Sequence, residues 1–565
     1  ITQHNVLVNR ATSITLSGLR VDNNKLSITN NLALRVNKYL KIDGILDLED
    51  ESQLLQPTGS IVDYTGSGNL ERDQQGSSNL FNYNYWSSPV SDNGTTFTIA
   101  NVMYDGTTAI NPQPLNWTAN YNANPLTTPI SISKRWLYLY ENYLDNSYAD
   151  WNAINENYNI PIGLGYSMKG SGSASANQNY TFVGQPNNGT ITSPVSGNFQ
   201  ALIGNPYPSA IDAVAFINDN SGVLLDGTLY FWEHAASNNS HNLSAYEGGY
   251  AARNLTHGVP AVSSPEINGQ GNSNKIPGRY VPVAQGFFVT GNGTGGMITF
   301  NNNQRVFAKE SDLNSFFLRS SNTPSEDLNT SQNEDNNQFI RLDFITPDNA
   351  TRQLVIGFMD NTNATDGVDY GYDGLNTDSF PNDMSFNIEG EKYIIQGVGS
   401  FDATKSYPLD INVSNGGNIE IRLNSLENFS DNRPVFIYDA LEQNYISINN
   451  QNFQTNLEPG NYSNRFYLVF QEDETLSTIK NEFENVNVKF LLDTDEIYIK
   501  TPPSIDITQL YLINVAGQTI ASWNATNLTM SNEIKIPVNN ISEGTYIIKA
   551  ETQTGTFNKK IIIKY

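Results

Sequence analysis

The densest group of potential metal ligands is an acidic stretch between Asp360 and Asp378. Within it, Asp366, Asp369 and Asp373 recur at three- and four-residue intervals among glycines, which permit tight loops. Closely spaced carboxylates of this kind suit Ca²⁺, which takes about 6–8 oxygen ligands. The spacing is not that of an EF-hand, and Asp and Asn also cap turns in loops that bind no ion. The pattern therefore predicts a calcium site with these three ligands, with a solvated loop as the alternative.

Histidines supply a second candidate metal site. His234, His241 and His257 lie in one part of the sequence, with Glu233 and Glu247 among them. Converging His and carboxylate side chains can bind zinc, but these spacings match no familiar zinc signature, so surface or hydrogen-bonded histidines are the favoured interpretation. The chain contains no cysteine. Disulfides, thiolate nucleophiles and Cys-ligated zinc are therefore excluded.

Signatures of catalysis are weak. A glycoside hydrolase needs two carboxylates facing each other across a cleft. Glu233, Glu247 and Glu266 are the nominees, although their spacing fixes no distance. The glycine-rich stretch Gly291–Gly296 lacks the lysine of a phosphate-binding loop and predicts a hairpin turn instead. We therefore expect no catalytic residues.

Tryptophans are the candidates for sugar binding. Indole rings beside Asn- and Asp-rich loops can stack on sugar rings while the amides bond to hydroxyls. Packing in the core is the commoner role of a tryptophan. The residues for which we predict contact with surface glycans are Trp86, Trp136, Trp151 and Trp232.

Charge and hydropathy limit the classes of partner. The 565 residues include 57 acidic and 31 basic side chains, which gives a formal net charge of −26. This field repels phosphate backbones and anionic membrane surfaces, so we expect no nucleic-acid partner, whereas cations are attracted. No apolar run approaches the roughly 20 residues that cross a bilayer, so no transmembrane segment is expected. The chain opens at Ile1 inside a strand pattern, which we interpret as part of a longer precursor.

The elements that would position these residues are all β-strands. Short bursts of alternating apolar residues run from about Ser13 to Leu55, separated by turn-forming pairs such as Asn30-Asn31. Strands so short and so evenly spaced cannot each build a core of their own. The pattern predicts a β-solenoid over residues 1–65, in which each rung buries its neighbour, with a β-meander as the alternative.

Two β-sandwiches are expected to follow. Residues 66–319 carry aromatic residues at strand spacing, punctuated by Gly, Pro and Asn, and favour one large aromatic-rich β-sandwich. Within them, only residues 210–218 have the pattern of a short helix. Residues 320–338 are polar and acidic and predict a linker. Strand patterns resume over residues 339–475, about the size of a second β-sandwich.

The last part of the chain, residues 476–565, combines a polar join with short strands and tight turns. Its characteristic positions, in order, are Gly517, Gln518, Gly544, Tyr546, Lys559, Lys560 and Lys564. This order, ending at the chain terminus, resembles the C-terminal sorting domain of the type IX secretion system of Bacteroidetes. The Pro-Asn-Pro element that opens the commonest members is absent, and residues 483–490 stand in its place. The body similarly resembles large flavobacterial surface proteins through Tyr85–Val90 and Gly204–Ser209.

The resemblance implies an Ig-like C-terminal sandwich that an outer-membrane translocon and its shuttle protein recognise, and that a sortase-like enzyme removes. It also implies passage through the periplasm to the outer cell surface or the medium. We therefore expect a non-catalytic adhesin or ligand-binding protein. The alternative is a secreted glycan-active enzyme, which a cleft with two facing carboxylates near Glu233 would favour.

Overall fold

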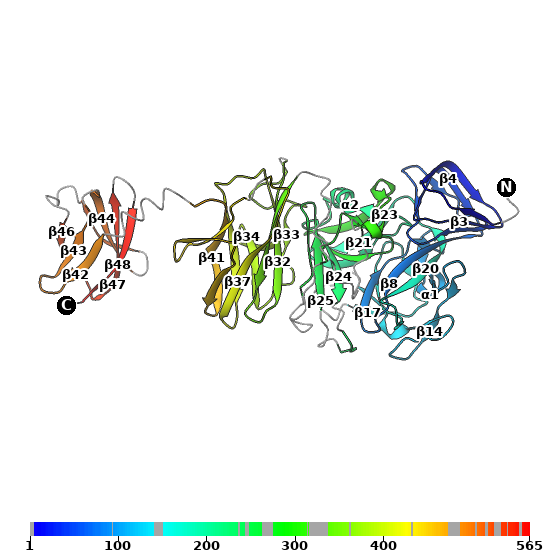
Figure 1. The fold of residues 1–565 in the computed structure, drawn as a ribbon, viewed down its shortest axis with the longest axis horizontal. Helices are drawn as coiled ribbons and strands as arrows, with labels where there is room; N and C mark the ends of the chain where they lie inside the picture. Colours follow the sequence, from blue (N-terminus) through cyan, green and yellow to red (C-terminus); the bar gives the residue numbers. More distant parts are fainter. Residues whose placement is uncertain are drawn as a thin grey trace. The chain divides into compact units, whose positions relative to one another are not determined.

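The regular structure of the described residues is nearly all β-strand, with 54% of these residues in strands and 4% in helices (Figure 1). This composition confirms the predicted all-β class. The chain divides into two compact units, Ile1–Phe470 and Gln471–Tyr565. The computed structural model describes residues 5–92, 94–140, 151–234, 238–242, 248–262, 275–312, 315, 337–360, 363–430, 433–472, 486–502, 505–514, 518–524, 533–538, 541–552 and 556–564.

The first unit begins with a β-solenoid, as the alternating bursts predict. One parallel series consists of β1 (Val6–Val8), β3 (Lys25–Ile28), β5 (Ile45–Leu48) and β8 (Asn69–Ser77). The other consists of β2 (Ile14–Val21), β4 (Ala33–Ile42), β6 (Gln53–Leu55) and β7 (Ile61–Val62). Paired residues such as Lys25 and Ile45, or Ala33 and Gln53, lie 20 positions apart in the chain. That interval is the length of one rung.

Asparagine and aspartate at the corners explain why the chain can turn so tightly. Asn30, Asn31 and Asp50 adopt positive φ angles of 64°, 54° and 53°. Side chains of this type tolerate the left-handed region because they form local hydrogen bonds. The Asn31 Oδ1 atom accepts the backbone N–H of Glu51 on the next rung at 3.0 Å. Corner residues therefore both turn the chain and join successive rungs.

The solenoid continues directly into the following part of the chain. Its last strand, β8, pairs antiparallel with β20 (Asn177–Pro186), and beyond it lie β12 (Met103–Asp105) and β13 (Gln113–Pro114). Buried side chains of the rungs, among them Leu46 and Leu70, share one hydrophobic core with Trp86 and Phe182. The solenoid therefore does not have a core to itself.

The middle of the first unit contains several small sheets. The largest has five strands, β22 (Gln200–Gly204), β28 (Gly286–Thr290), β24 (Leu229–His234), β25 (Gly248–Arg253) and β26 (Gly258–Val259). Helix α2 (Ala213–Asp219) is capped by Asp212, whose side chain accepts the backbone N–H of Val214, and the helix overlaps the predicted helical stretch.

The hairpin predicted at Gly291–Gly296 is wrong. The strand before it, β28, pairs with β22 and β24, whereas β29 (Gly295–Phe300) pairs with β21 (Ile191–Ser196) in another sheet. Positive φ angles at Gly295 and Gly296 let the chain leave one sheet and enter the next. A local pattern could not show this, because the partner strands β21, β22 and β24 lie about 60 to 100 residues earlier in the chain.

The rest of the first unit is an 11-stranded sheet. Its main path runs β39 (Asn444–Ser447), β38 (Phe436–Asp439), β41 (Gly460–Val469), β36 (Ser406–Val413), β34 (Asn382–Ile388), β35 (Glu391–Val398), β32 (Thr351–Phe358), β31 (Gln338–Ile345), β37 (Gly417–Glu427) and β40 (Phe453–Leu457), and β33 (Gly374–Leu375) pairs with β35. The rings of Phe453 on β40 and Phe466 on β41 meet at 5.6 Å, although these strands lie far apart along the path. The sheet therefore folds over its own core as a sandwich. That core extends to Tyr85 and Phe288 of the preceding sheets.

The second unit is a small β-sandwich. One antiparallel sheet contains β42 (Asn487–Leu491), β43 (Glu496–Lys500) and β46 (Glu533–Pro537). The other contains β45 (Thr519–Asn524), β44 (Ile507–Asn514), β47 (Gly544–Thr552) and β48 (Thr556–Ile563). Ile497 and Ile536 from the first sheet and Leu510 and Ile548 from the second are buried in one core.

None of the helices in the described ranges is long and apolar enough to cross a bilayer.

Candidate functional site

The predicted sorting residues lie on the turns and the outer edge of the second unit. The turn between β44 and β45 is closed by Gln518, whose backbone N–H donates to the Asn514 Oδ1 atom at 2.9 Å. Gly544 begins β47, and the buried Tyr546 donates its hydroxyl to the Ser542 carbonyl at 2.9 Å. Gly517 lies outside the described residues. These positions are therefore structural parts of the turns and the core.

The final strand is an exposed sheet edge with positive charge. Among the described residues of this sheet, β48 is paired with β47 alone, and β42 of the other sheet lies near it. Phe557 and Ile561 point into the core, while Lys560, Ile562 and Lys564 are exposed. Lys559 is half-buried. Unpaired backbone groups beside lysines are features that a partner strand can read by adding to the sheet.

The three aspartates of the predicted calcium site serve separate partners. Asp366 forms an ion pair with Lys405 at 2.5 Å, and Asp369 accepts the hydroxyl and backbone N–H of Thr365. Asp373 accepts the backbone N–H groups of Asp369 at 2.6 Å and of Gly397 at 3.0 Å. Over the described ranges, no group of three or more His, Asp or Glu side chains could hold a metal ion. Calcium binding stays a prediction.

The same acidic stretch joins the 11-stranded sheet to the sheets that precede it in the first unit. The Gly371 backbone donates to the Asp226 carbonyl at 2.9 Å, and its own carbonyl accepts from the Leu255 N–H at 2.7 Å. The Tyr370 hydroxyl donates to the Ile217 carbonyl at 2.9 Å. The Asp226 carboxylate also accepts the N–H of Leu375 at 3.1 Å. We call residues 369–375 the clasp, because they tie the 11-stranded sheet to the sheets before it.

Each histidine of the predicted zinc site has its own surroundings. His234 is buried, and its Nε2 atom accepts the Tyr83 N–H at 2.9 Å. Burial, with a further effect of the nearby Lys169 ammonium, lowers the pKa of His234 well below its ordinary value. His257 lies 2.7 Å from the Arg341 guanidinium. Glu233 pairs with Lys275 at 2.7 Å. Glu247 and Glu266, the other nominated carboxylates, lie outside the described residues.

His241 belongs to an aromatic cluster near the surface. Its ring stacks on Trp136 at 4.7 Å, and the Lys169 ammonium lies 4.0 Å from the same indole and 3.1 Å from His241. Burial lowers the pKa of Lys169 to about 7. Exposed Tyr121 contacts both rings. The aromatic rings around the Lys169 ammonium attract it through cation–π interactions, although burial has the larger effect on its pKa.

The four tryptophans differ in exposure. Trp86 is 0% exposed and packs edge-on against Tyr180, and Trp232 is 8% exposed. Trp136 and Trp151 are half-buried. A sugar ring needs a free indole face, so core packing accounts for Trp86 and Trp232, and the glycan prediction retains only Trp136 and Trp151.

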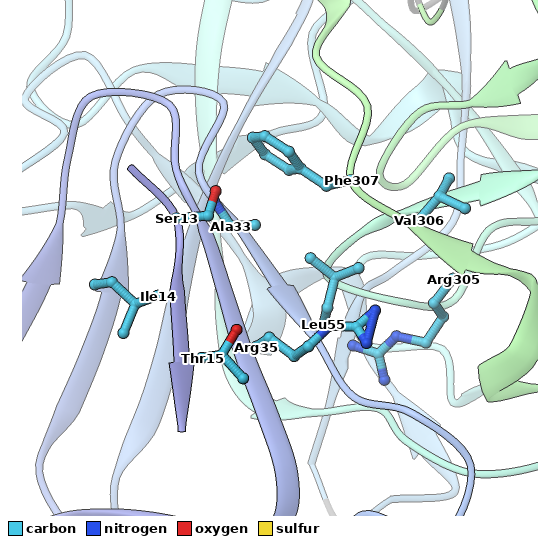
Figure 2. Close-up of a pocket in the computed structure, with 9 residues that line it drawn as sticks. All are labelled: Ser13, Ile14, Thr15, Ala33, Arg35, Leu55, Arg305, Val306 and Phe307. Atoms are coloured by element: carbon cyan, nitrogen blue, oxygen red, sulfur yellow. The ribbon is translucent and has the colours of Figure 1, made fainter. Parts of the chain in front are cut away.

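A pocket of 370 Å³ lies where the solenoid meets β30 (Arg305–Val306). Figure 2 shows the guanidinium groups of Arg35 and Arg305 pointing toward one another beside Leu55. The residues that line the pocket are Ser13, Ile14, Thr15, Ala33, Arg35, Leu55, Arg305, Val306 and Phe307. Sequence reasoning missed it, because its arginines are separated by more than half the length of the first unit and share no motif.

Arg305 is the fixed part of this pocket. It is only 5% exposed, and its guanidinium donates to Ser209, Asn188 and Asn302 side chains and to the Leu54 carbonyl. All four acceptors are neutral. Burial without a carboxylate partner lowers the pKa of Arg305 to about 10. A guanidinium remains charged at neutral pH even with this shift, so the pocket wall is positive.

Comparison with known families identifies the class of protein. Residues 493–564 match the family described as a secretion system C-terminal sorting domain. The chain is therefore cargo of the type IX secretion system, a class of secreted and cell-surface proteins. Residues 1–470 match the family described as a domain of unknown function, DUF8693. Because this match covers more than half of the chain, the protein belongs to that family.

Other comparisons add little. No curated protein matches the chain. A solved structure titled "Biofilm associated protein - BSP domain" aligns over 66% of this chain and 81% of its own, at 8% identity and a TM-score of 0.12. A TM-score this low supports no inference about fold or function.

Proposed function

We propose that the unit Ile1–Phe470 is a non-catalytic adhesin or ligand-binding body, and that the unit Gln471–Tyr565 directs its export to the outer cell surface. The observation that carries the proposal is that the residues matching the sorting family form a separate compact sandwich with its own core. A signal that is read in the folded state needs such an independent unit. The specific partners are the outer-membrane translocon, its shuttle protein and a sortase.

The edge strand β48 is the surface that the shuttle or translocon recognises. Its lysines add positive charge to a chain whose net charge is −26, so the edge differs electrostatically from most of the surface. Exposed Ile562, at 64%, adds an apolar contact between Lys560 and Lys564. Backbone pairing would provide affinity, and these side chains would provide specificity.

The surroundings of Glu233, the residue considered as a catalytic acid, support the non-catalytic assignment. Glu233 is buried in an ion pair with Lys275. Its carboxylate lies 2.7 Å from the Lys275 ammonium, whereas a glycosidase acid faces a second carboxylate across a cleft. The open pocket and the half-buried tryptophans instead offer surfaces for binding.

Deletion of residues 471–565 tests the export role. The truncated chain is expected to accumulate in the periplasm. Residues 1–470 keep their own hydrophobic cores and stay folded, but they lack the C-terminal sandwich that directs export. Cell fractionation and surface protease shaving measure its location, and protease resistance of the retained material controls for folding. Surface display equal to that of the full chain would contradict the proposal.

A further inference from the structure

The pocket at the solenoid has an unusual charge for this protein. Acidic residues outnumber basic ones by 57 to 31 in the chain, yet its lining includes two arginines and no carboxylate. A positive hollow on an acidic protein attracts small anions that the rest of the surface repels. The pocket is therefore a candidate binding site and not only a gap between packed elements.

Arg305 supplies a preorganised donor. The hydrogen bonds from its Nε, Nη1 and Nη2 atoms to Ser209, Asn188, Asn302 and Leu54 use four of the five N–H groups of a guanidinium. The Arg305 side chain also lies 4.9 Å from the Tyr207 ring. A donor held this firmly loses little further entropy when an anion binds.

Arg35 supplies the second, adjustable donor. It projects from β4 and is exposed. Within the described residues, the Arg35 side chain has no hydrogen-bond or ion-pair partner. Nothing in that part of the chain competes with a ligand for its guanidinium. Because both arginines line one pocket, a single anionic group can accept from both.

The remaining walls indicate an organic ligand. Leu55, Val306 and Phe307 contribute apolar surface to the lining. The Ser13 Oγ atom accepts the Ala33 N–H at 3.1 Å, which leaves its hydroxyl hydrogen free to donate. A pocket of this volume holds a molecule of about one ring, with its anionic end on the arginines and its apolar face on Leu55.

From this geometry we infer that the pocket binds a small organic carboxylate. A planar carboxylate carries a single charge, matches the free guanidinium fork of Arg35 and can also accept the one remaining N–H of Arg305. Polyanions are disfavoured, because the long-range field of the whole chain repels each additional charge. The inference deepens the proposed ligand-binding role of the body and rests on it, but it is independent of export by the second unit.

Calorimetric titration of the purified full chain tests the inference. The probes are benzoate and glucuronate, which distinguish an aromatic acid from a sugar acid, with inorganic phosphate and glucose as comparisons. We expect millimolar or tighter binding of at least one carboxylate and weaker binding of phosphate and glucose. Arg35→Gln is expected to raise the Kd about tenfold, and Arg35→Glu to abolish binding, because a charge-assisted pair is lost or reversed.

Lys38→Gln is the matched control. Lys38 is an exposed cation on the same strand, outside the pocket lining, so its loss changes net charge equally and is expected to leave the Kd unchanged. Arg35 is exposed and its side chain has no hydrogen bond or ion pair within the described residues, so we expect its variants to fold, which circular dichroism checks. Equal loss in Lys38→Gln, unchanged binding in Arg35→Gln, tighter binding of phosphate, or no binding of either carboxylate would overturn the inference. None of these outcomes would alter where the chain is exported, which the deletion measures separately.

Discussion

At the scale of single residues, the acidic stretch has a role that depends on its neighbours. Asp373 accepts two backbone N–H groups, which favour its ionised form, but burial has the larger effect and raises its pKa to about 7. The pKa in the folded state is thus above the value of about 3.9 in an unfolded chain. Its contribution to stability is complete below about pH 4 and is lost as the pH rises through about 7.

Substitution of Asp373 tests this linkage. Asp373→Asn is expected to flatten the decline in the free energy of unfolding between pH 4 and 7, because the titrating group is gone. The variant is also expected to lose about 1–3 kcal/mol of stability, since one buried N–H loses its acceptor. Urea denaturation at several pH values provides the measurement. Asp402→Asn, which removes an exposed carboxyl whose pKa is lowered, is the control; an unchanged slope in Asp373→Asn would refute the account.

The same residues show what a sequence can predict about a site. The spacing of Asp366, Asp369 and Asp373 predicts a calcium site, with a solvated loop as the alternative, and calcium binding stays a prediction. It does not reveal that the clasp bonds to Asp226 and Leu255, because those partners lie more than 100 residues earlier in the chain. Likewise, Arg35 and Arg305 form one pocket only through the three-dimensional fold.

At the scale of elements, periodicity and turn chemistry predicted what is local. Alternating apolar residues and asparagine corners, both visible in the sequence, predicted the solenoid, and the structure adds the 20-residue length of a rung. The pairing of distant strands is not local, so the hairpin predicted at Gly291–Gly296 was wrong. The shared core of Leu70, Trp86 and Phe182 was missed for the same reason. Alternation identifies a buried face, but not the element that covers it.

The edge strand β48 gives a prediction at this scale. Changing Lys560 and Lys564 together to glutamate is expected to reduce surface display strongly, because recognition of the positive edge becomes repulsive. The fold is expected to persist, since Lys560 and Lys564 are exposed. Lys535→Glu, on the exposed face of β46 in the other sheet, is the control for added negative charge. Normal display of the double variant, measured by surface labelling, would rule out β48 as the recognised edge.

At the scale of the whole molecule, the chain consists of two units that we assign to different roles, ligand binding and export. Residues 1–470 form one compact unit, whose solenoid, middle sheets and 11-stranded sheet share hydrophobic cores. The boundaries predicted at residues 65 and 319 both fall within this unit. Residues 471–565 have their own core. An export signal and its cargo can then fold, and be recognised, independently.

The most direct test of this account transfers the second unit to an unrelated protein. Residues 471–565 are fused behind a signal peptide and a fluorescent protein that folds in the periplasm, in a host with the type IX system, and surface exposure is measured by antibody labelling of intact cells. The account predicts that the fusion reaches the cell surface or the medium, and that the same fusion with Lys560 and Lys564 changed to glutamate does not. Retention of the unaltered fusion in the periplasm, although folded, would contradict it.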